Sequence, residues 1–310
     1  MVRMIPFVSV IVAAYNAEKT IERCLEHLLK LNYPNYEIIV VDNDSGDETK
    51  NIVKNYSSVI YLFEKKRGWP AARNRGIKYS KAGFVANIDS DCFAQKDWLK
   101  ILVRELISEP GIGGVVGKTL VEKGESLLEQ YYAEGEPFNI ERHIGGNSYV
   151  PWGGGNNAYR KEVFEIIGYY DSEHYTSGAD VEFHHRLKNN SKYRIKYVPE
   201  AVIYHSARNS IKGLFKASAK YSYDGLIQAR EFSELKIRYS LYLLKKINEI
   251  LKNIVGLFYR FIKFIFGKET KLRAVSPLFS IVSYSGNLYG FLKAKIKLQL
   301  EIQKNTIRKA

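Results

Sequence analysis

Three apolar runs restrict the fold of this chain more than any other feature of its sequence. They extend from Val8 to Ala14, from Tyr36 to Val41 and from Phe84 to Ile88, and stretches with helical spacing of apolar residues separate them. Predominantly apolar runs of this kind are typical of strands that are covered on both faces of a sheet. Strands and helices in this alternation predict an α/β fold with a mostly parallel sheet, right-handed crossovers and flanking helices.

Polar residues follow each apolar run, at the point where the predicted strand ends. Ligands of such sheets bind outside the carboxyl ends of the strands, so these residues are expected to line one crevice. A nucleotide would fit there, with the Tyr15 ring stacked on the base and Asp42 or Asn43 bonded to the base edge or the ribose. Taken singly, Tyr15 also fits a packed ring, and residues 42–47 fit a solvated turn. The residues expected to contact the ligand are Ala14, Tyr15, Asn16, Asp42, Asn43, Asp89 and Ser90.

Two acidic residues, Asp89 and Asp91, come directly after the third apolar run. At this spacing the two carboxylates point the same way, so one can hold a hydroxyl while the other binds a hard divalent cation through oxygen. Acid pairs are also common on solvated turns, but the position after a buried strand favours a binding site.

A basic loop precedes this strand and leads into a predicted helix. Five Lys and Arg residues fall within residues 65–75, among them Arg67 and Arg73. Such a cluster suits a diphosphate, although a charge run is often only a solvated face. Arg73 and Asn74 are the preferred pair of ligand contacts because they belong to the start of the helix.

These motifs, in this order, resemble those of the family 2 inverting glycosyltransferases, which have the Rossmann-like GT-A fold. The resemblance covers about residues 7–210 and rests on Ser9 to Asn16, Val40 to Ser45, Ala72 to Asn74, and Asp89 to Asp91. It implies a nucleotide-diphosphate sugar as donor, a divalent metal (Mn²⁺ or Mg²⁺) at Asp91, and a general base further along the chain. A GT-A catalytic domain is therefore expected over residues 1–210.

The second half of this region also resembles the family. The segment from Trp152 to Arg160 is similar to a glycine-rich strand and loop on the acceptor side, where Gly154, Gly155 and Asn156 would contact the substrate. Glycines there let the backbone approach a sugar closely. Their simpler role is a bulge or a tight bend.

Two further residues take their expected roles from the resemblance. Asp180 matches the position of the general base; without the resemblance it would be an ordinary acid at a helix N-terminus. His205 matches a histidine that completes the metal shell or contacts the diphosphate. Two departures from the family pattern are Ala179, where an acid usually precedes the base, and Asn43, where many members have a second aspartate.

Charge is distributed unevenly along the chain. Residues 1–205 hold 26 Lys and Arg against 27 Asp and Glu, whereas residues 206–310 hold 21 against 6. The basic last third suggests an anionic partner, either a membrane surface or a nucleic acid. The two cysteines, Cys24 and Cys92, supply neither a disulfide framework nor a zinc cluster, which fits a reducing compartment. The run up to Ala14 lacks a cleavage site and is interpreted as a strand, not a signal peptide.

Residues 211–310 are predicted to form a basic amphipathic helical region. Between Leu241 and Phe266, the basic residues Lys245, Lys252, Arg260 and Lys263 fall in one narrow strip, and the rest of the circumference is apolar. This pattern suits a helix in the plane of a membrane interface; packing on the catalytic domain or a dimer contact is the alternative. Pro277, serines and glycines interrupt the apolar segment 275–292, which favours a helical hairpin over a membrane span.

The sequence therefore predicts an inverting, metal-dependent glycosyltransferase, peripheral on the cytoplasmic face of the cell membrane. Asp180 would remove the proton of a hydroxyl on a glycan or a lipid-linked acceptor. A nucleic-acid-binding protein is one alternative, but the aromatic residues of the tail are not interleaved with its basic strip. A nucleotidyltransferase is another. It would normally have a glycine-rich loop after the first strand, and residues 13–17 contain no glycine.

Overall fold

The structure is a computed structural model that describes residues 5–143, 152–174, 178–231 and 239–307. It divides into two compact units. The first comprises residues up to Glu122 together with Glu136–Ser206, and the second comprises Lys123–Gly135 together with the residues from Ala207 onward.

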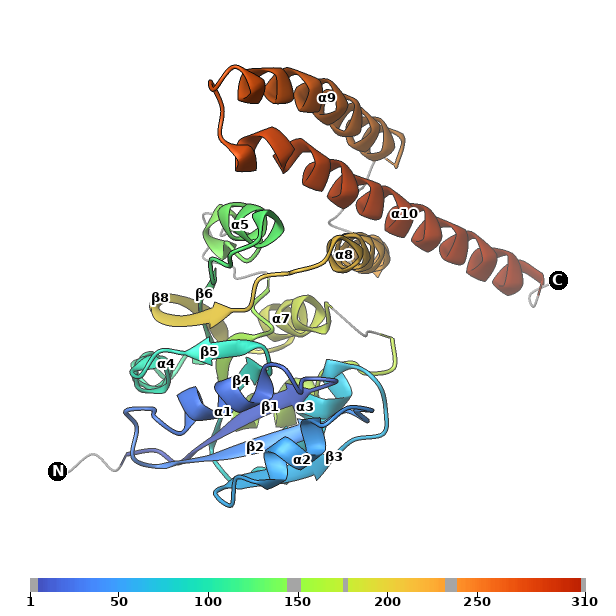
Figure 1. Ribbon diagram of the computed structural model, residues 1–310. Helices are drawn as coiled ribbons and strands as arrows, with labels where there is room; N and C mark the ends of the chain where they lie inside the picture. Colours follow the sequence, from blue (N-terminus) through green and yellow to red (C-terminus); the bar gives the residue numbers. More distant parts are fainter. Residues whose placement is uncertain (1–4, 144–151, 175–177, 232–238, 308–310) are drawn as a thin grey trace. The chain divides into compact units, whose positions relative to one another are not determined.

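A single eight-stranded sheet forms the centre of the first unit (Figure 1). The strand order is β3-β2-β1-β4-β7-β6-β8-β5, and β7 and β5 run antiparallel to their neighbours while the other pairs are parallel. The predicted α/β fold with a mostly parallel sheet is confirmed. The strands are β1 (Val8–Ala14), β2 (Tyr36–Asp42), β3 (Val59–Phe63), β4 (Phe84–Asp89), β5 (Cys92–Ala94), β6 (Ile112–Val121), β7 (Asn156–Arg160) and β8 (Arg194–His205).

Helices cover both faces of this sheet. Apolar side chains of α1 and α4 pack with one face of β1 and β4 in the main core. On the other face, α3 lies so close to the sheet that a Cβ on Gly76 would be 2.7 Å from a methyl of Ile11, which is why a glycine stands there. The helices of this unit are α1 (Ile21–Leu28), α2 (Thr49–Lys54), α3 (Trp69–Tyr79), α4 (Trp98–Leu106), α6 (Lys161–Ile167) and α7 (Ala179–Asn190), with a short 3₁₀ turn at Ile140–His143.

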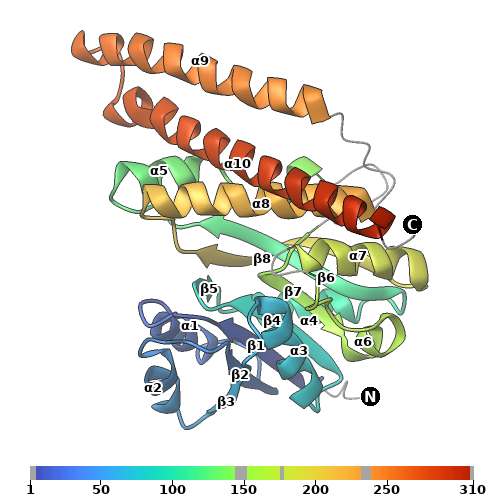
Figure 2. The same cartoon turned by 90° about the vertical axis from the view of Figure 1, so that its right-hand side faces the viewer.

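The second unit is helical and consists of α5 (Leu127–Glu134), α8 (Ile211–Glu231), α9 (Tyr239–Ile265) and α10 (Lys271–Ile307) (Figure 2). Although α5 belongs to residues 1–210, it packs in this unit, where the hydroxyls of Tyr131 and Ser280 lie 2.9 Å apart. Within the described residues, no helix combines the length and the hydropathy that a membrane-spanning segment needs.

The segment 275–292 is not a hairpin but part of the single helix α10. Its glycines serve packing: a Cβ on Gly286 would lie 2.5 Å from the Phe215 carbonyl oxygen of α8, and one on Gly290 would lie 1.9 Å from that of Ala219. Pro277 has no N–H, so it cannot donate a hydrogen bond to the carbonyl oxygen of Arg273, one helical turn earlier. That oxygen instead accepts hydrogen bonds from Arg260 Nη1 on α9 (3.3 Å) and from Ser276 Oγ (3.1 Å).

Asn156, expected from the sequence to contact substrate, ties the sheet together. Its Oδ1 accepts a hydrogen bond from Trp98 Nε1 (2.8 Å), and its Nδ2 donates to the carbonyls of Lys118 (2.9 Å) and Ala201 (3.1 Å). The side chain is buried. Its amide hydrogens and its carbonyl oxygen are therefore all bonded to protein, which gives it a structural role linking β7 to α4, β6 and β8.

Replacing Asn156 with leucine should destabilise the fold. The Asn156→Leu variant leaves one buried donor and two buried acceptors unpaired, so we expect a loss of about 3 kcal/mol in the free energy of unfolding, measured by urea denaturation. Asn51→Leu on the exposed surface of α2 is the control and should change stability by less than about 0.5 kcal/mol. Equal stabilities of the two variants would contradict the structural role.

Candidate active site

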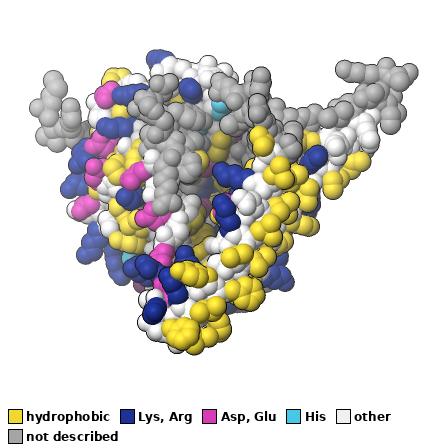
Figure 3. All heavy atoms as spheres, turned by 90° about the horizontal axis from the view of Figure 1, so that it is seen from above, with side chains coloured by type: hydrophobic (Ala, Val, Ile, Leu, Met, Phe, Trp, Pro, Cys, Tyr) yellow, Lys and Arg dark blue, Asp and Glu magenta, His cyan; other side chains and the backbone are white. Residues whose placement is uncertain are grey.

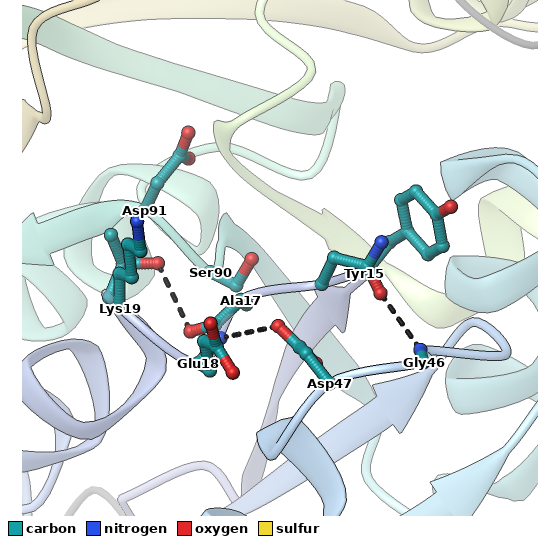
Figure 4. Close-up of a pocket in the computed structure, with 10 residues that line it drawn as sticks. Tyr15, Ala17, Glu18, Lys19, Gly46, Asp47, Ser90 and Asp91 are labelled. Carbon is teal, nitrogen blue, oxygen red and sulfur yellow. Dashed lines mark hydrogen bonds between the residues drawn. The ribbon is translucent and has the colours of Figure 1, made fainter. Parts of the chain in front are cut away.

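The ends of three strands meet at one edge of the sheet. Ala14 at the end of β1 is paired with Asp42 of β2, and Ala13 is paired with Asp89 of β4. An open pocket of about 520 Å³ lies at this edge. Figure 4 shows Tyr15 on one side of it and Ser90 and Asp91, from the turn after β4, on the other. The structure thus brings the predicted strand-end residues together.

Asn16 joins the two loops that form one wall of this pocket. The residue adopts a left-handed conformation (φ +48°), and its Oδ1 accepts the N–H of Gly46 at 2.9 Å. Its own N–H donates to Ser45 Oγ at 2.9 Å, and nearby the N–H of Glu18 donates to Asp47 Oδ2 at 3.0 Å. These bonds fix the loop after β1 against the loop after β2.

The Tyr15 ring is 53% exposed and is covered on one face by Arg67. The guanidinium carbon lies 4.3 Å from the ring centroid, and Arg67 Nε lies 3.1 Å from Asp44 Oδ2. The arginine thus covers one face of the ring and places positive charge beside it, which an anionic group could contact.

Asp42 and Asn43 are both buried, and their side chains bond to the protein. Asp42 accepts hydrogen bonds from the Tyr61 hydroxyl (2.8 Å) and from the N–H of Ser45 (3.0 Å). Burial and the bond to Asp42 raise the pKa of Tyr61, so the hydroxyl stays protonated and remains a donor. The carboxylate of Asp42 is thereby held at the strand end.

The amide of Asn43 fixes the basic loop that carries Arg67. Its Nδ2 donates to the carbonyls of Glu64 (3.0 Å) and Lys66 (2.6 Å), and its Oδ1 accepts the N–H of Gly68 (2.7 Å). An aspartate at this position could not donate to two carbonyls. This explains why an asparagine stands where the family pattern has an acid, and it gives Asn43 a role in shaping the loop.

Arg73 and Asp89 form an ion pair at the centre of the site. Arg73 is 1% exposed, its Nη2 lies 2.5 Å from Asp89 Oδ1, and its guanidinium lies over the Trp69 ring at 4.3 Å. Among the described residues, Nε and Nη1 of Arg73 have no hydrogen-bond partner. The other carboxylate oxygen of Asp89 lies against Gly155, where an added Cβ would be only 2.4 Å away.

Asn74, the second residue of the predicted pair, is bonded elsewhere. Its Nδ2 donates to the Tyr170 carbonyl (2.7 Å), and its Oδ1 accepts the N–H of Tyr170 (3.1 Å). The side chain is buried. Asn74 therefore anchors the loop before α7, and Arg73 is the member of the pair that reaches the site.

Asp180 lies in the first turn of α7, beside the glycine turn before β7. Its Oδ2 accepts the N–H of Gly153 (3.1 Å) and that of Gly154 (2.9 Å). No hydrogen bond to Oδ1 comes from any residue that the structure describes. Ala179, the departure from the family pattern, is fully buried. The carboxylate is thus oriented through one oxygen only.

Asp91 and His205 are far apart in the sequence but adjacent in the fold. The antiparallel pairing of β5 with β8 sets Cys92 opposite His205, and this brings Asp91 Oδ2 to 3.4 Å from His205 Nε2. His205 Nδ1 lies 2.6 Å from the Ser206 carbonyl, which can only accept, so Nδ1 carries the hydrogen and Nε2 offers its lone pair. A carboxylate and an imidazole nitrogen are both ligands of divalent cations, so this pair could hold one. Burial raises the pKa of the Cys92 thiol, the third group of this cluster.

Residues 9–168 match the family model described as glycosyl transferase family 2. The chain belongs to this family. It is 31% identical to the glycosyltransferase AglE of Haloferax volcanii over 225 residues, which are 67% of this chain and 69% of that protein. It is also 27% identical to the poly-beta-1,6-N-acetyl-D-glucosamine synthase of Staphylococcus epidermidis over 250 residues, which are 76% of this chain and 60% of that protein. The predicted enzyme class, a glycosyltransferase, is confirmed.

Two solved structures share the fold of this glycosyltransferase. One is the mannosyltransferase PcManGT from Pyrobaculum calidifontis in complex with GDP-Man and Mn²⁺, with a TM-score of 0.58 and 19% identity. The match covers 92% of this chain and 87% of the PcManGT chain. S. aureus TarS 1-349, in complex with UDP-GlcNAc, has a TM-score of 0.54 and 19% identity. The match covers 93% of this chain and 91% of the TarS chain. The predicted GT-A fold is confirmed.

Changing Asn43 to aspartate should loosen the basic loop. In Asn43→Asp the carboxylate faces the carbonyl oxygens of Glu64 and Lys66, to which it cannot donate, so we expect the melting temperature to fall by several degrees. Protease cleavage within residues 64–68 should become faster. Asn55→Asp, at an exposed asparagine just after α2, makes the same chemical change away from this loop and is the control. Unchanged protection of the loop in Asn43→Asp would contradict this role.

Proposed function

We propose that this glycosyltransferase moves a sugar from a nucleotide-diphosphate donor to a hydroxyl of a glycan or lipid-linked acceptor, with inversion at the anomeric carbon. The observation that carries the proposal is the carboxylate of Asp180. One of its oxygens is fixed by two backbone N–H groups, and the other has no hydrogen bond from the described residues. A general base needs this arrangement: a fixed orientation and one oxygen free for the proton.

The reaction is a single displacement. Asp180 accepts the proton of the acceptor hydroxyl as its oxygen attacks the anomeric carbon, and the bond from that carbon to the diphosphate breaks. The nucleoside diphosphate leaves on the opposite side, so the configuration at the carbon inverts. No covalent intermediate is needed.

The donor would bind at the strand ends. Tyr15 offers a ring face to the base, Asp89 offers a carboxylate to the ribose, and Arg67 and Arg73 supply positive charge near the diphosphate. The two solved structures with the same fold contain GDP-Man and UDP-GlcNAc, which are both nucleotide-diphosphate sugars. These complexes support the donor class.

Asp91 and His205 would hold the divalent metal. When bound, the ion would supply positive charge that neutralises the leaving diphosphate. PcManGT, which has the same fold, was solved in complex with Mn²⁺, and this supports a divalent metal.

Replacing the base and the metal ligand should separate catalysis from donor binding. We expect Asp180→Asn to lower sugar transfer at least about 100-fold because the proton acceptor is lost. Transfer is measured with labelled UDP-GlcNAc and GDP-Man and an extract of glycans and glycolipids. The thermal stabilisation by UDP or GDP with Mn²⁺ should be unchanged in Asp180→Asn. In Asp91→Ala the Mn²⁺-dependent part of that stabilisation should disappear.

Asp97→Asn removes a carboxylate on the exposed surface at the start of α4 and is the matched control, with no expected effect on transfer or binding. Wild-type transfer by Asp180→Asn would refute the proposed base. Stabilisation that is the same with and without Mn²⁺ in the wild type would refute the metal at Asp91.

We also propose that α9 binds an anionic membrane surface. One side of this helix packs on α10, where the Tyr242 and Phe291 rings stack at 4.4 Å. Another side is apolar and exposed, and Phe258 on it is 68% exposed. Figure 3 shows hydrophobic side chains gathered in a band on the helices, with Lys and Arg beside them. The apolar side includes Leu244, Leu251, Val255, Phe258, Ile262 and Ile265, at spacings of three, four and seven residues.

Basic residues border this apolar side. Lys245, Lys252 and Lys263 follow one another along the same flank of α9, and Lys263 lies over the Tyr259 ring. An apolar face with lysines at its edge is what a helix needs to lie in the headgroup region of an anionic bilayer. Such a location would bring the enzyme to a lipid-linked acceptor on the cytoplasmic side.

The membrane proposal predicts binding to charged vesicles. The purified protein should sediment with vesicles of phosphatidylglycerol and phosphatidylcholine, and less with phosphatidylcholine alone. The Phe258→Ser/Ile262→Ser variant should lose at least about tenfold in affinity through lost apolar burial. Ile166→Ser, an exposed apolar residue on α6, is the control. Dimers that depend on Phe258, or binding to duplex DNA in preference to vesicles, would contradict the proposal.

A further inference from the structure

Two buried asparagines face each other in the middle of the sheet. Asn87 on β4 and Asn157 on β7 are paired in the antiparallel register, and both are fully buried. Asn87 Nδ2 donates to Asn157 Oδ1 at 2.8 Å. Burying two amides is costly unless each one is bonded, and an apolar pair would fill the same space without that cost. The pair therefore calls for an explanation beyond packing.

The partners of Asn157 fix the orientation of its amide. Nδ2 lies 2.6 Å from the carbonyl oxygen of Gly153 and 3.0 Å from that of Gly154. Carbonyl oxygens only accept, so the NH₂ group must face them, and Oδ1 must face Asn87. Asn87 then donates through its own NH₂ group, and its Oδ1 is left without a hydrogen-bond partner among the described residues.

These two glycines are the ones that hold Asp180. The carbonyl of Gly153 and the N–H of Gly154 belong to the same planar peptide unit and point in opposite directions. Asn157 binds the oxygen of this unit, and Asp180 Oδ2 binds its N–H at 2.9 Å. The unit cannot rotate about the chain without breaking one of the two bonds.

We propose that Asn157, supported by Asn87, is the positioning residue of the general base: it fixes the peptide unit between Gly153 and Gly154 that orients the Asp180 carboxylate. The inference rests on the proposed role of Asp180. It assigns a function to a pair of residues that contact neither the strand-end pocket nor the metal ligands.

Two variants separate positioning from stability. Asn87→Leu leaves Asn157 Oδ1 unpaired but keeps both bonds to the glycine turn, so the melting temperature should fall while kcat stays within about threefold. The double variant Asn87→Leu/Asn157→Leu removes the unpaired amide oxygen but also the donor to the Gly153 and Gly154 carbonyls, so it should regain part of the lost stability. Its kcat should nevertheless fall by roughly 10-fold to 100-fold, because the peptide unit that orients the Asp180 carboxylate loses its bond to Asn157. The KM for the donor should change little in each variant.

A purely structural pair would give the opposite pattern, with activity following the melting temperature in every variant. If the double leucine variant does not fold, Asn157→Ala removes the same two donors without added volume, and it is compared with Asn87→Ala. Equal kcat in the two alanine variants would then overturn the proposal.

A double-mutant cycle connects the effect to Asp180. When Asp180 is already replaced by asparagine, the further change Asn157→Leu should alter the residual transfer rate by less than about twofold, since its effect passes through the base. Additive losses would overturn the inference. Wild-type transfer by Asp180→Asn alone would instead refute the base itself, whereas loss in Asp180→Asn with wild-type kcat in the double leucine variant would refute only the role of Asn157.

Discussion

The backbone from Gly153 to Gly155 approaches two carboxylates closely, and the arrangement of the candidate site depends on this contact. Asp89 lies against Gly155, and Asp180 receives the N–H groups of the two preceding residues. A Cβ at Gly155 would lie 2.4 Å from an Asp89 oxygen and would displace it, and a Cβ at Gly154 would be in tight contact with Asp180 Oδ2 at 3.1 Å. The short turn before β7 therefore sets the distance between the end of β4 and the start of α7. In the proposed reaction these are the donor and acceptor sides.

The antiparallel pairing of β4 with β7 brings the glycine turn to the end of β4. In a purely parallel sheet the strand next to β4 would end, and not begin, at the edge where β4 ends. Because β7 runs the other way, its first residues and the glycine turn lie beside Asp89. The pairing of β5 with β8 has a similar effect for Asp91 and His205. The two departures from parallel order thus place the glycine turn beside Asp89 and His205 beside Asp91.

The sequence predicts the strands and the strand-end residues well because both depend on local pattern. Apolar runs mark β1, β2 and β4, and polar residues after a buried strand must reach the same edge. It cannot tell whether a polar side chain faces a ligand or a carbonyl of its own chain: Asn74 and Asn156 are both bonded within the protein. Asn87 was missed because its partner, Asn157, is 70 residues away, and only the strand order brings the two together.

The two aspartates that the sequence treats as one motif differ in their physical situation. Asp89 compensates the charge of Arg73, which is almost wholly buried, so removing that carboxylate would leave a buried cation unpaired and destabilise the site. Asp91 lies on the turn after β4 and faces His205 at 3.4 Å. A loss of activity on substitution of Asp89 therefore combines structural and ligand effects. A change at Asp91 reports on the metal more directly, and so the metal hypothesis is best tested there.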